Sequence, residues 1–310
     1  MIVRPRPGAL AILFALRGSI LPQIAPQVIA ITALACLVVA TEPSWAHAIP
    51  LHAGIGPFTL IGLALSIFLS FRNNACYDRW WEARKVWGAL IVEARGLARL
   101  LGALLPPDEA ETETGARRRR CLRRLAGFTH ALHAHLRGRD AALAAAPFLP
   151  QAERGRLPSC ASPADAALAY LAADLGAALR QGTLSDVSFG LIEQKLAGLS
   201  GVQAACERIK GTPLPFAYTL LLYRTAWLYC LLLPFGLAET LGWGTPVATA
   251  LVAYTFFGLD ALGDELEEPF GSAANDLPLD ALLRTVDGVV QDALGAPVPP
   301  PLAPERYWLR

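Results

Sequence analysis

The sequence has little charge for its length, and the composition of a typical soluble protein is missing. Charged residues make up 17% of the 310 residues and hydrophobic residues 54%, whereas soluble domains average about 25% charged and about 45–50% apolar residues. The formal net charge is only +1, so the chain lacks the basic excess typical of nucleic-acid-binding proteins. The composition favours a protein with membrane-embedded segments and without a nucleic-acid partner.

Motifs of catalysis and cofactor binding are also missing. The chain has no glycine-rich phosphate loop, no nucleophile elbow and no metalloprotease helix. Its six cysteines are scattered without a Cys-x-x-Cys pair, which indicates reduced, packed thiols and argues against a disulfide framework. His130 and His133 share a helix face near His135, but no carboxylate or cysteine in the sequence completes a metal site with them. We predict no enzyme activity, no cofactor and no bound metal.

What the chain does have is four apolar blocks, which cover residues 20–40, 57–72, 216–241 and 246–262. An α-helix rises about 1.5 Å per residue, so about 20 apolar residues cross the hydrocarbon core of a bilayer. The second block is short by itself, but it leads without a breaker into a polar helical stretch. The blocks predict four transmembrane helices.

The distribution of Lys and Arg orients these helices. The linkers 41–56 and 239–245 contain neither residue. By contrast, Arg4, Arg6 and Arg17 precede the first block, Arg72 ends the second block, and Arg79 follows it. Cytoplasmic loops carry the excess of Lys and Arg in membrane proteins. We therefore predict a multi-pass protein of the plasma membrane with both termini and the long middle segment in the cytoplasm.

Outside the blocks, the pattern is helical over residues 73–212 and 263–310. We see no alternating strand pattern and no internal repeat, and residues 296–304 are proline-rich and irregular. The fold is predicted to be all-α, with one domain over residues 1–310. A basic cluster, residues 117–120 with Arg123 and Arg124, is interpreted as a solvated helix face rather than as a surface for anionic lipid or another subunit.

The strongest local motif is residues 68–84, FLSFRNNACYDRWWEAR. It reads as a membrane exit, with an arginine, two amides and aromatic residues at headgroup level. Together with residues 17–20 (RGSI), 206–219 (CERIKGTPLPFAYT) and 265–278 (ELEEPFGSAANDLP), it resembles the bestrophin family of ion channels, and the bacterial branch more than the animal one. These matches keep their order and extend over nearly the whole chain.

The resemblance implies a homopentamer with one central pore, a narrow neck in the membrane and an aperture at the cytosolic end. The neck positions of the family fall on Leu63, Ile67 and Phe71. Residues at i, i+4 and i+8 lie on one helix face and would form an apolar sleeve roughly 12 Å long, which can gate by dewetting. By periodicity alone the same residues fit lipid-facing or helix-packing positions, because the whole block is apolar; the resemblance favours the neck.

The resemblance places the second constriction, the aperture, on Val187, where a valine packed inside a helix bundle is the alternative. Asp186 beside it would add negative charge. Asp260 and Asp264, at the cytosolic exit of the fourth block, either concentrate cations or pair with arginines of the cytosolic helices. All three carboxylates are candidate ion-attracting residues.

Two departures from the animal family members bear on function. Their calcium-binding acidic run corresponds here to residues 272–276 (SAAND), which keep one carboxylate, whereas calcium needs six to eight oxygen ligands. We predict no calcium activation. The animal channels carry phenylalanine at the middle neck position, where a ring of aromatic edges would favour anions; Ile67 is aliphatic. Since bacterial relatives of this kind resemble sodium channels, cation conduction is the preferred prediction.

The predicted function is a homopentameric bacterial inner-membrane channel that conducts monovalent ions passively. Its partners are the lipid bilayer, the permeant ions and further copies of itself. A chloride-selective channel of the same architecture is the first alternative. A secondary transporter is the second, although transporters typically show internal repeats that are absent from this sequence. A receptor or scaffold that conducts nothing is the third.

Overall fold

The computed structural model describes residues 1–4, 8, 12, 15, 18–45, 56–105 and 112–310. These residues form helices, turns and two isolated β-bridges near the chain ends, so the all-α prediction is confirmed. The chain folds as two compact units. We call Arg4–Trp80 with Pro213–Pro269 the apolar unit, and Met1–Val3, Trp81–Thr212 and Phe270–Arg310 the polar unit. Arg17 and the linker residues 46–55 lie outside the described residues, and the single-domain organisation stays a prediction.

The apolar unit contains α2 (Leu21–Trp45), the first part of α3 (Gly56–Leu104), α9 (Phe216–Leu241), the short 3-10 helix η3 (Gly242–Gly244) and α10 (Thr245–Glu267). Each of the four predicted blocks begins within one residue of a helix start. Among the described residues, three helical stretches are long and apolar enough to cross a membrane: Leu21–Glu42, Gly56–Leu104 and Phe216–Glu267. The third comprises α9, η3 and α10, so the helices fit four crossings, and that number stays a prediction.

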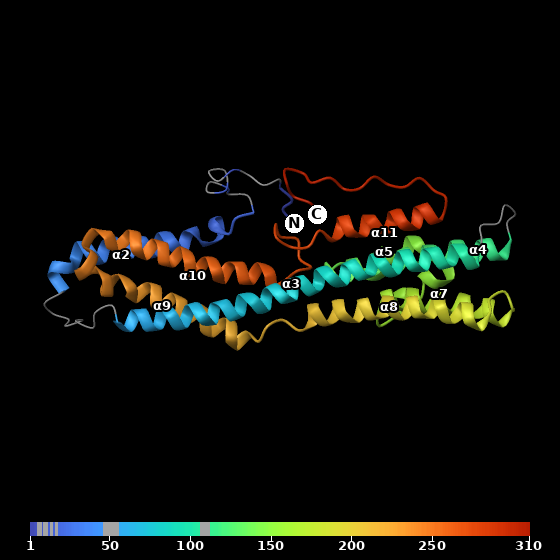
Figure 1. Ribbon diagram of the computed structural model, residues 1–310, viewed down its shortest axis with the longest axis horizontal. Coiled ribbons are helices and arrows are strands. Elements are labelled where there is room, and N and C mark those ends of the chain that lie inside the picture. Colours follow the sequence, from blue (N-terminus) through green and yellow to red (C-terminus); the bar gives the residue numbers. More distant parts are fainter. Residues whose placement is uncertain (5–7, 9–11, 13–14, 16–17, 46–55, 106–111) are drawn as a thin grey trace. The chain divides into compact units, whose positions relative to one another are not determined.

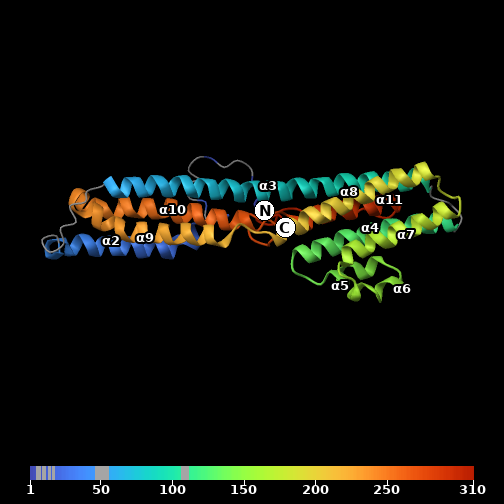
Figure 2. The same cartoon turned by 90° about the horizontal axis from the view of Figure 1, so that it is seen from below.

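A hydrophobic core joins the four long helices of the apolar unit. It contains Ile24 and Ile31 of α2, Leu65 and Leu69 of α3, Leu222, Ala226 and Cys230 of α9, and Ala253, Phe256 and Phe257 of α10. Figures 1 and 2 show α2, α9 and α10 side by side with the first part of α3. The Thr32 and Thr249 hydroxyls donate to carbonyls one turn earlier in their own helices, at 2.7 and 2.9 Å. These two hydroxyls are thus satisfied within their own helices, as an apolar surrounding favours.

The polar unit contains the rest of α3 and a set of helices packed around α4. They are α4 (Glu113–Leu136), α5 (Ala141–Ala145), η1 (Ala146–Phe148), α6 (Gln151–Arg154), η2 (Leu157–Ser159), α7 (Pro163–Arg180), α8 (Asp186–Gly211) and α11 (Leu279–Ala293). The Ser162 and Ser185 side chains accept hydrogen bonds from the backbone N–H groups of Asp165 and Ser188 and so cap α7 and α8. Residues 297–304 form no regular secondary structure, which confirms the predicted irregular tail.

The interpretation of the basic cluster as a solvated helix face is wrong for three of its arginines. Arg117 and Arg124 of α4 are buried, and with Arg120 they surround the Asp174 carboxylate of α7. The N–O distances are 3.1 Å from Arg117, 2.9 Å from Arg120 and 2.6 Å from Arg124. Spacing of three to four residues places the three guanidinium groups on one helix face. Asp174 compensates their charge together with Glu113, which pairs with Arg117 and Arg120, and Glu153, which pairs with Arg124.

Helix α11 lies within residues 263–310, which were predicted to be helical without bounds for a single helix, and it supplies the partners of two histidines. His130 Nε2 lies 2.8 Å from Oδ1 of Asp287, and His133 Nε2 lies 2.7 Å from Oδ1 of Asp280. Each histidine therefore has its own carboxylate partner on α11. No group of three or more metal-ligating side chains occurs among the described residues.

Candidate functional site

The predicted neck residues lie on the first part of α3 and face away from the core. Leu63 is 59% exposed, Ile67 46% and Phe71 60%. The opposite face of the same helix carries Leu65 and Leu69, which are fully buried in the core of the apolar unit. The packing therefore fixes the rotation of α3 so that the three predicted residues form an exposed apolar row.

Hydroxyl groups within this segment do not make the row polar. Ser66 Oγ donates to the carbonyl of Gly62 at 2.8 Å, and Ser70 Oγ donates to the carbonyl of Ser66 at 2.8 Å. Both hydroxyls are therefore bonded to the backbone of their own helix. The three side chains of the row are themselves hydrocarbon, which is the property expected of a dewetting constriction.

The residue that follows the row on α3 is a fully buried arginine. Arg72 is completely inaccessible, and its Nη1 lies 2.7 Å from Oδ1 of Asp260 on α10. Nη2 is hydrogen-bonded to Asp264 and lies 3.7 Å from Oε2 of Glu267. Burying a guanidinium in an apolar unit is costly unless carboxylates compensate it, so this cluster ties α3 to α10.

The sequence left two roles open for Asp260 and Asp264, and both residues pair with an arginine. Their partner is Arg72 of the second block, not an arginine of the cytosolic helices. The signal was present in the sequence, because Asp260, Asp264 and Glu267 are spaced i, i+4 and i+7 and so share one face of α10. Asp264 remains exposed while Asp260 is buried. The ion-attracting role of the two residues stays a prediction.

The predicted aperture residue lies at the start of α8 in the polar unit. Val187 is 76% exposed, and Asp186 beside it is also exposed. The helix begins here because Ser185 caps it, and the Asp186 carboxylate in the first turn complements the helix dipole. Val187 is therefore not packed inside the helix bundle of this chain.

The stretch that corresponds to the calcium-binding run of the animal family members is bonded within itself. Asp276, its one carboxylate, is buried, and its Oδ2 accepts a hydrogen bond of 2.6 Å from the Ala273 backbone N–H. This carboxylate therefore stabilises the turn before α11. The expected insensitivity to calcium stays a prediction.

Long apolar helices, an exposed apolar row and a buried ion cluster define the class, an all-α membrane protein. A family model described as Bacterial/Fungal Bestrophin protein matches residues 1–292. The chain belongs to this bacterial and fungal bestrophin family, as the resemblance predicted.

Relatives and solved structures agree with this assignment. The chain is 46% identical over 308 residues to a voltage-dependent anion channel-forming protein of Mesorhizobium japonicum, covering 99% of this chain and 97% of that protein. It is 38% identical to the voltage-dependent anion channel-forming protein YneE of Escherichia coli, with 99% of both chains covered. The crystal structure of a bestrophin homolog from Klebsiella pneumoniae superposes with a TM-score of 0.82 at 36% identity, covering 88% of this chain and 99% of that one. The relatives are named as channels, not as enzymes.

Proposed function

We propose that the chain is the subunit of a homopentameric channel that conducts monovalent ions passively through a neck lined by Leu63, Ile67 and Phe71. The observation that carries the proposal is the exposed apolar row on α3, which the core packing turns outward from the subunit. In a ring of subunits such a row would line a shared path. The constriction would hold back ions because they shed water only where replacement ligands exist.

The aromatic member of this row favours the conduction of anions, in place of the sodium conduction that was predicted from the sequence. Phe71 is the one aromatic neck residue, and a ring of aromatic edges presents weakly positive hydrogen atoms to the path. The Mesorhizobium and Escherichia relatives are named anion channel-forming proteins. Monovalent anions, chloride above all, are therefore the proposed permeant ions.

A cation channel is the second candidate, and exposed carboxylates favour it. Asp186 lies exposed beside Val187, the proposed aperture residue. A ring of five such carboxylates would raise the local concentration of cations and repel anions. Val187 itself would add an apolar collar. The two candidates thus differ in which ring decides the selectivity: Phe71 for anions, Asp186 for cations.

The proposed location is the bacterial inner membrane, with both chain ends in the cytoplasm. The linkers without Lys or Arg support this orientation, since positive residues gather on the cytoplasmic side. Calcium is not part of the proposal, because the stretch that corresponds to the animal calcium site keeps one carboxylate, and that carboxylate is bonded to its own turn.

Reversal potentials measured on the purified protein in planar bilayers test the function and the ion preference together. In asymmetric NaCl the current should reverse near the chloride equilibrium potential. Reversal near the sodium potential, moved towards zero by Asp186→Asn, would select the cation channel. Absence of any current, or flux that requires a proton gradient, would contradict the channel and favour a transporter. Native mass spectrometry of the solubilised protein should give five subunits.

A further inference from the structure

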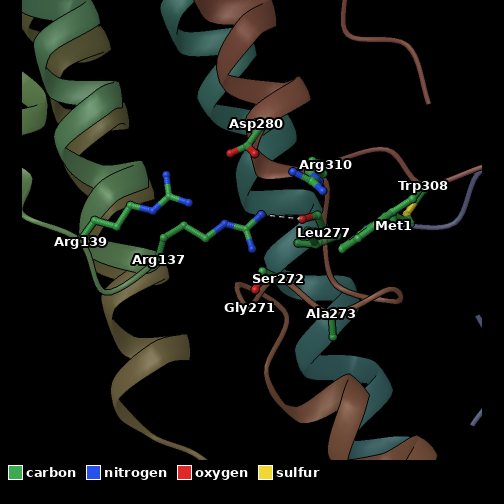
Figure 3. A pocket seen from close by; sticks show the side chains of 10 residues that line it. All are labelled: Met1, Arg137, Arg139, Gly271, Ser272, Ala273, Leu277, Asp280, Trp308 and Arg310. Atoms are coloured by element: carbon green, nitrogen blue, oxygen red, sulfur yellow. Dashed lines mark hydrogen bonds between the residues drawn. The ribbon is translucent and has the colours of Figure 1, made fainter. Parts of the chain in front are cut away.

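A basic cavity in the polar unit has no role in the proposed conduction path. Its volume is about 240 Å³, and its lining includes Arg137, Arg139 and Arg310, with Asp280, Trp308 and the backbone turn 271–273. Arg137 and Arg139 follow the end of α4, whereas Arg310 and Trp308 belong to the last residues of the chain. Figure 3 shows the side chains gathered around this space.

Arg137 is the central group and lacks a full set of acceptors. Its Nη2 donates to the Leu277 carbonyl over a long 3.5 Å, the dashed line in Figure 3. Its Nη1 is buried and has no hydrogen-bond partner among the described residues. Burial lowers the pKa of the Arg137 guanidinium, and the charges of Asp280 and Asp276 offset this only in part. A buried, charged donor without an acceptor is destabilising, so a bound acceptor would be favourable here.

The charges around the cavity do not cancel. Three arginines and one aspartate line it, which leaves a formal charge of +2 on the lining side chains, and the Met1 ammonium and the Arg310 terminal carboxylate cancel each other. The one side-chain carboxylate is already engaged, because Oδ1 of Asp280 lies 2.7 Å from Nε2 of His133. The Arg310 guanidinium lies over the Trp308 ring at 4.8 Å from its centroid, which orients its donors. The cavity therefore presents oriented positive donors without matching acceptors.

We propose that this cavity is a binding site for a small oxyanion of the phosphate class, held by Arg137, Arg139 and Arg310. Guanidinium groups match the geometry of phosphate oxygens and donate to them in pairs. A dianion would balance the +2 charge of the lining. The volume of the cavity is smaller than that of sites for drug-sized ligands, which is about 300–1,000 Å³. Orthophosphate or pyrophosphate therefore fits it better than a whole nucleotide.

Isothermal titration calorimetry on the full-length protein in detergent tests the site. Inorganic phosphate and pyrophosphate are titrated at constant ionic strength, with chloride as the comparison ion. We expect saturable binding of one phosphate per subunit and none for chloride. Arg137→Gln should weaken the apparent Kd at least tenfold, since a charge-assisted hydrogen bond to a buried donor is lost. Arg139→Gln, at an exposed position that the fold tolerates, should weaken it about threefold.

The matched control is Arg99→Gln, which removes an exposed arginine of α3 outside this cavity. Its Kd should equal that of the unmodified chain. Equal weakening by Arg99→Gln and Arg139→Gln, or no saturable phosphate binding at millimolar concentration, would overturn the proposal. A parallel titration with short-chain phosphatidic acid separates the two sources of this chemistry: tighter binding of the lipid assigns the site to a headgroup, and tighter binding of inorganic phosphate assigns it to a free anion.

Discussion

The two units handle charge and apolar surface in opposite ways. The apolar unit exposes large side chains such as Leu63 and Phe71 and buries one charged cluster around Arg72. The polar unit buries Arg117 and Arg124, and one carboxylate, Asp174, pairs with both of them and with the half-buried Arg120. In the apolar unit, large apolar side chains can be exposed because lipid or neighbouring subunits surround them. In the polar unit, charged side chains can be buried because they are paired. Substitutions should therefore have different consequences in the two units.

The largest expected effect is the loss of the Asp174 carboxylate in the polar unit. Asp174→Asn removes the carboxylate that Arg117 and Arg124 share, so that Glu113 and Glu153 are left as the acidic partners of these two buried arginines. Breaking a buried ion pair by removing one partner costs about 3–5 kcal/mol of unfolding free energy, and denaturant titration of the purified protein measures it. Glu193→Gln, which changes an exposed carboxylate of α8, is the control and should cost less than about 0.5 kcal/mol. Equal stability of the two variants would refute the pairing.

The next effect concerns the buried cluster of the apolar unit. Arg72→Met removes the guanidinium that compensates the buried Asp260 carboxylate and should cost about 3 kcal/mol. The double variant Arg72→Met with Asp260→Leu should recover most of that loss, because an apolar pair of similar volume replaces the ion pair. Unfolding in mixed micelles, followed by circular dichroism, compares the variants. If the double variant is no more stable than Arg72→Met, the unpaired Asp260 carboxylate is not the cause of the loss in stability.

The polar unit should also lose stability in acid. Burial alone would raise the pKa of the Asp174 carboxyl, but hydrogen bonds from Arg120, Arg124 and Arg117 outweigh it and lower the pKa to about 2. A lowered pKa in the folded state gives stability that is present above the ordinary pKa of 3.8 and lost as the pH falls from about 4 to 2. The loss should amount to about 2 kcal/mol. Thermal unfolding between pH 5 and 2 measures it, and the Asp174→Asn variant should show a flatter pH profile.

The smallest expected effects on stability come from replacing one glycine in each unit by alanine. A Cβ at Gly263 of α10 would lie 2.7 Å from Oδ1 of Asn73 and 3.0 Å from Nη1 of Arg72, so Gly263→Ala should cost about 1–2 kcal/mol through overpacking. Gly201 of α8 has no atom within 4 Å of that position. Gly201→Ala should stabilise the protein by about 0.5–1 kcal/mol, since alanine favours the helix. Thermal midpoints should move in opposite directions, and a common direction would contradict this account of the packing.

Much of the apolar unit could be predicted from the sequence, because its helices are set by long apolar runs. The starts of α2, α3, α9 and α10 lie within one residue of the predicted blocks. The row of Leu63, Ile67 and Phe71 followed from family resemblance and helical spacing, and the core packing supplies what the sequence could not, namely which face of α3 is buried.

The polar unit was harder to predict, because its charges are paired across long distances in the sequence. The spacing of Arg117, Arg120 and Arg124 indicated one helix face, but their partner Asp174 lies on another helix, and no local pattern identifies it. Helix α11 lies within the region predicted to be helical, and its bounds had an available signal: Leu279, Leu283, Val286 and Val290 recur at helical spacing and are buried. Pairing between residues of different helices, such as His133 and Asp280, can be recognised only in the three-dimensional structure.

The most direct test of the neck compares two isoleucines of α3 in one flux assay. Ile67 and Ile61 are exposed to 46% and 47%, but they lie about 120° apart around the helix axis. Ion flux from liposomes that hold the purified protein should rise severalfold with Ile67→Ala, since it widens the constriction, and stay unchanged with Ile61→Ala. Equal flux from both variants and the unmodified protein, or a rise with Ile61→Ala alone, would contradict a neck on the face of Leu63, Ile67 and Phe71.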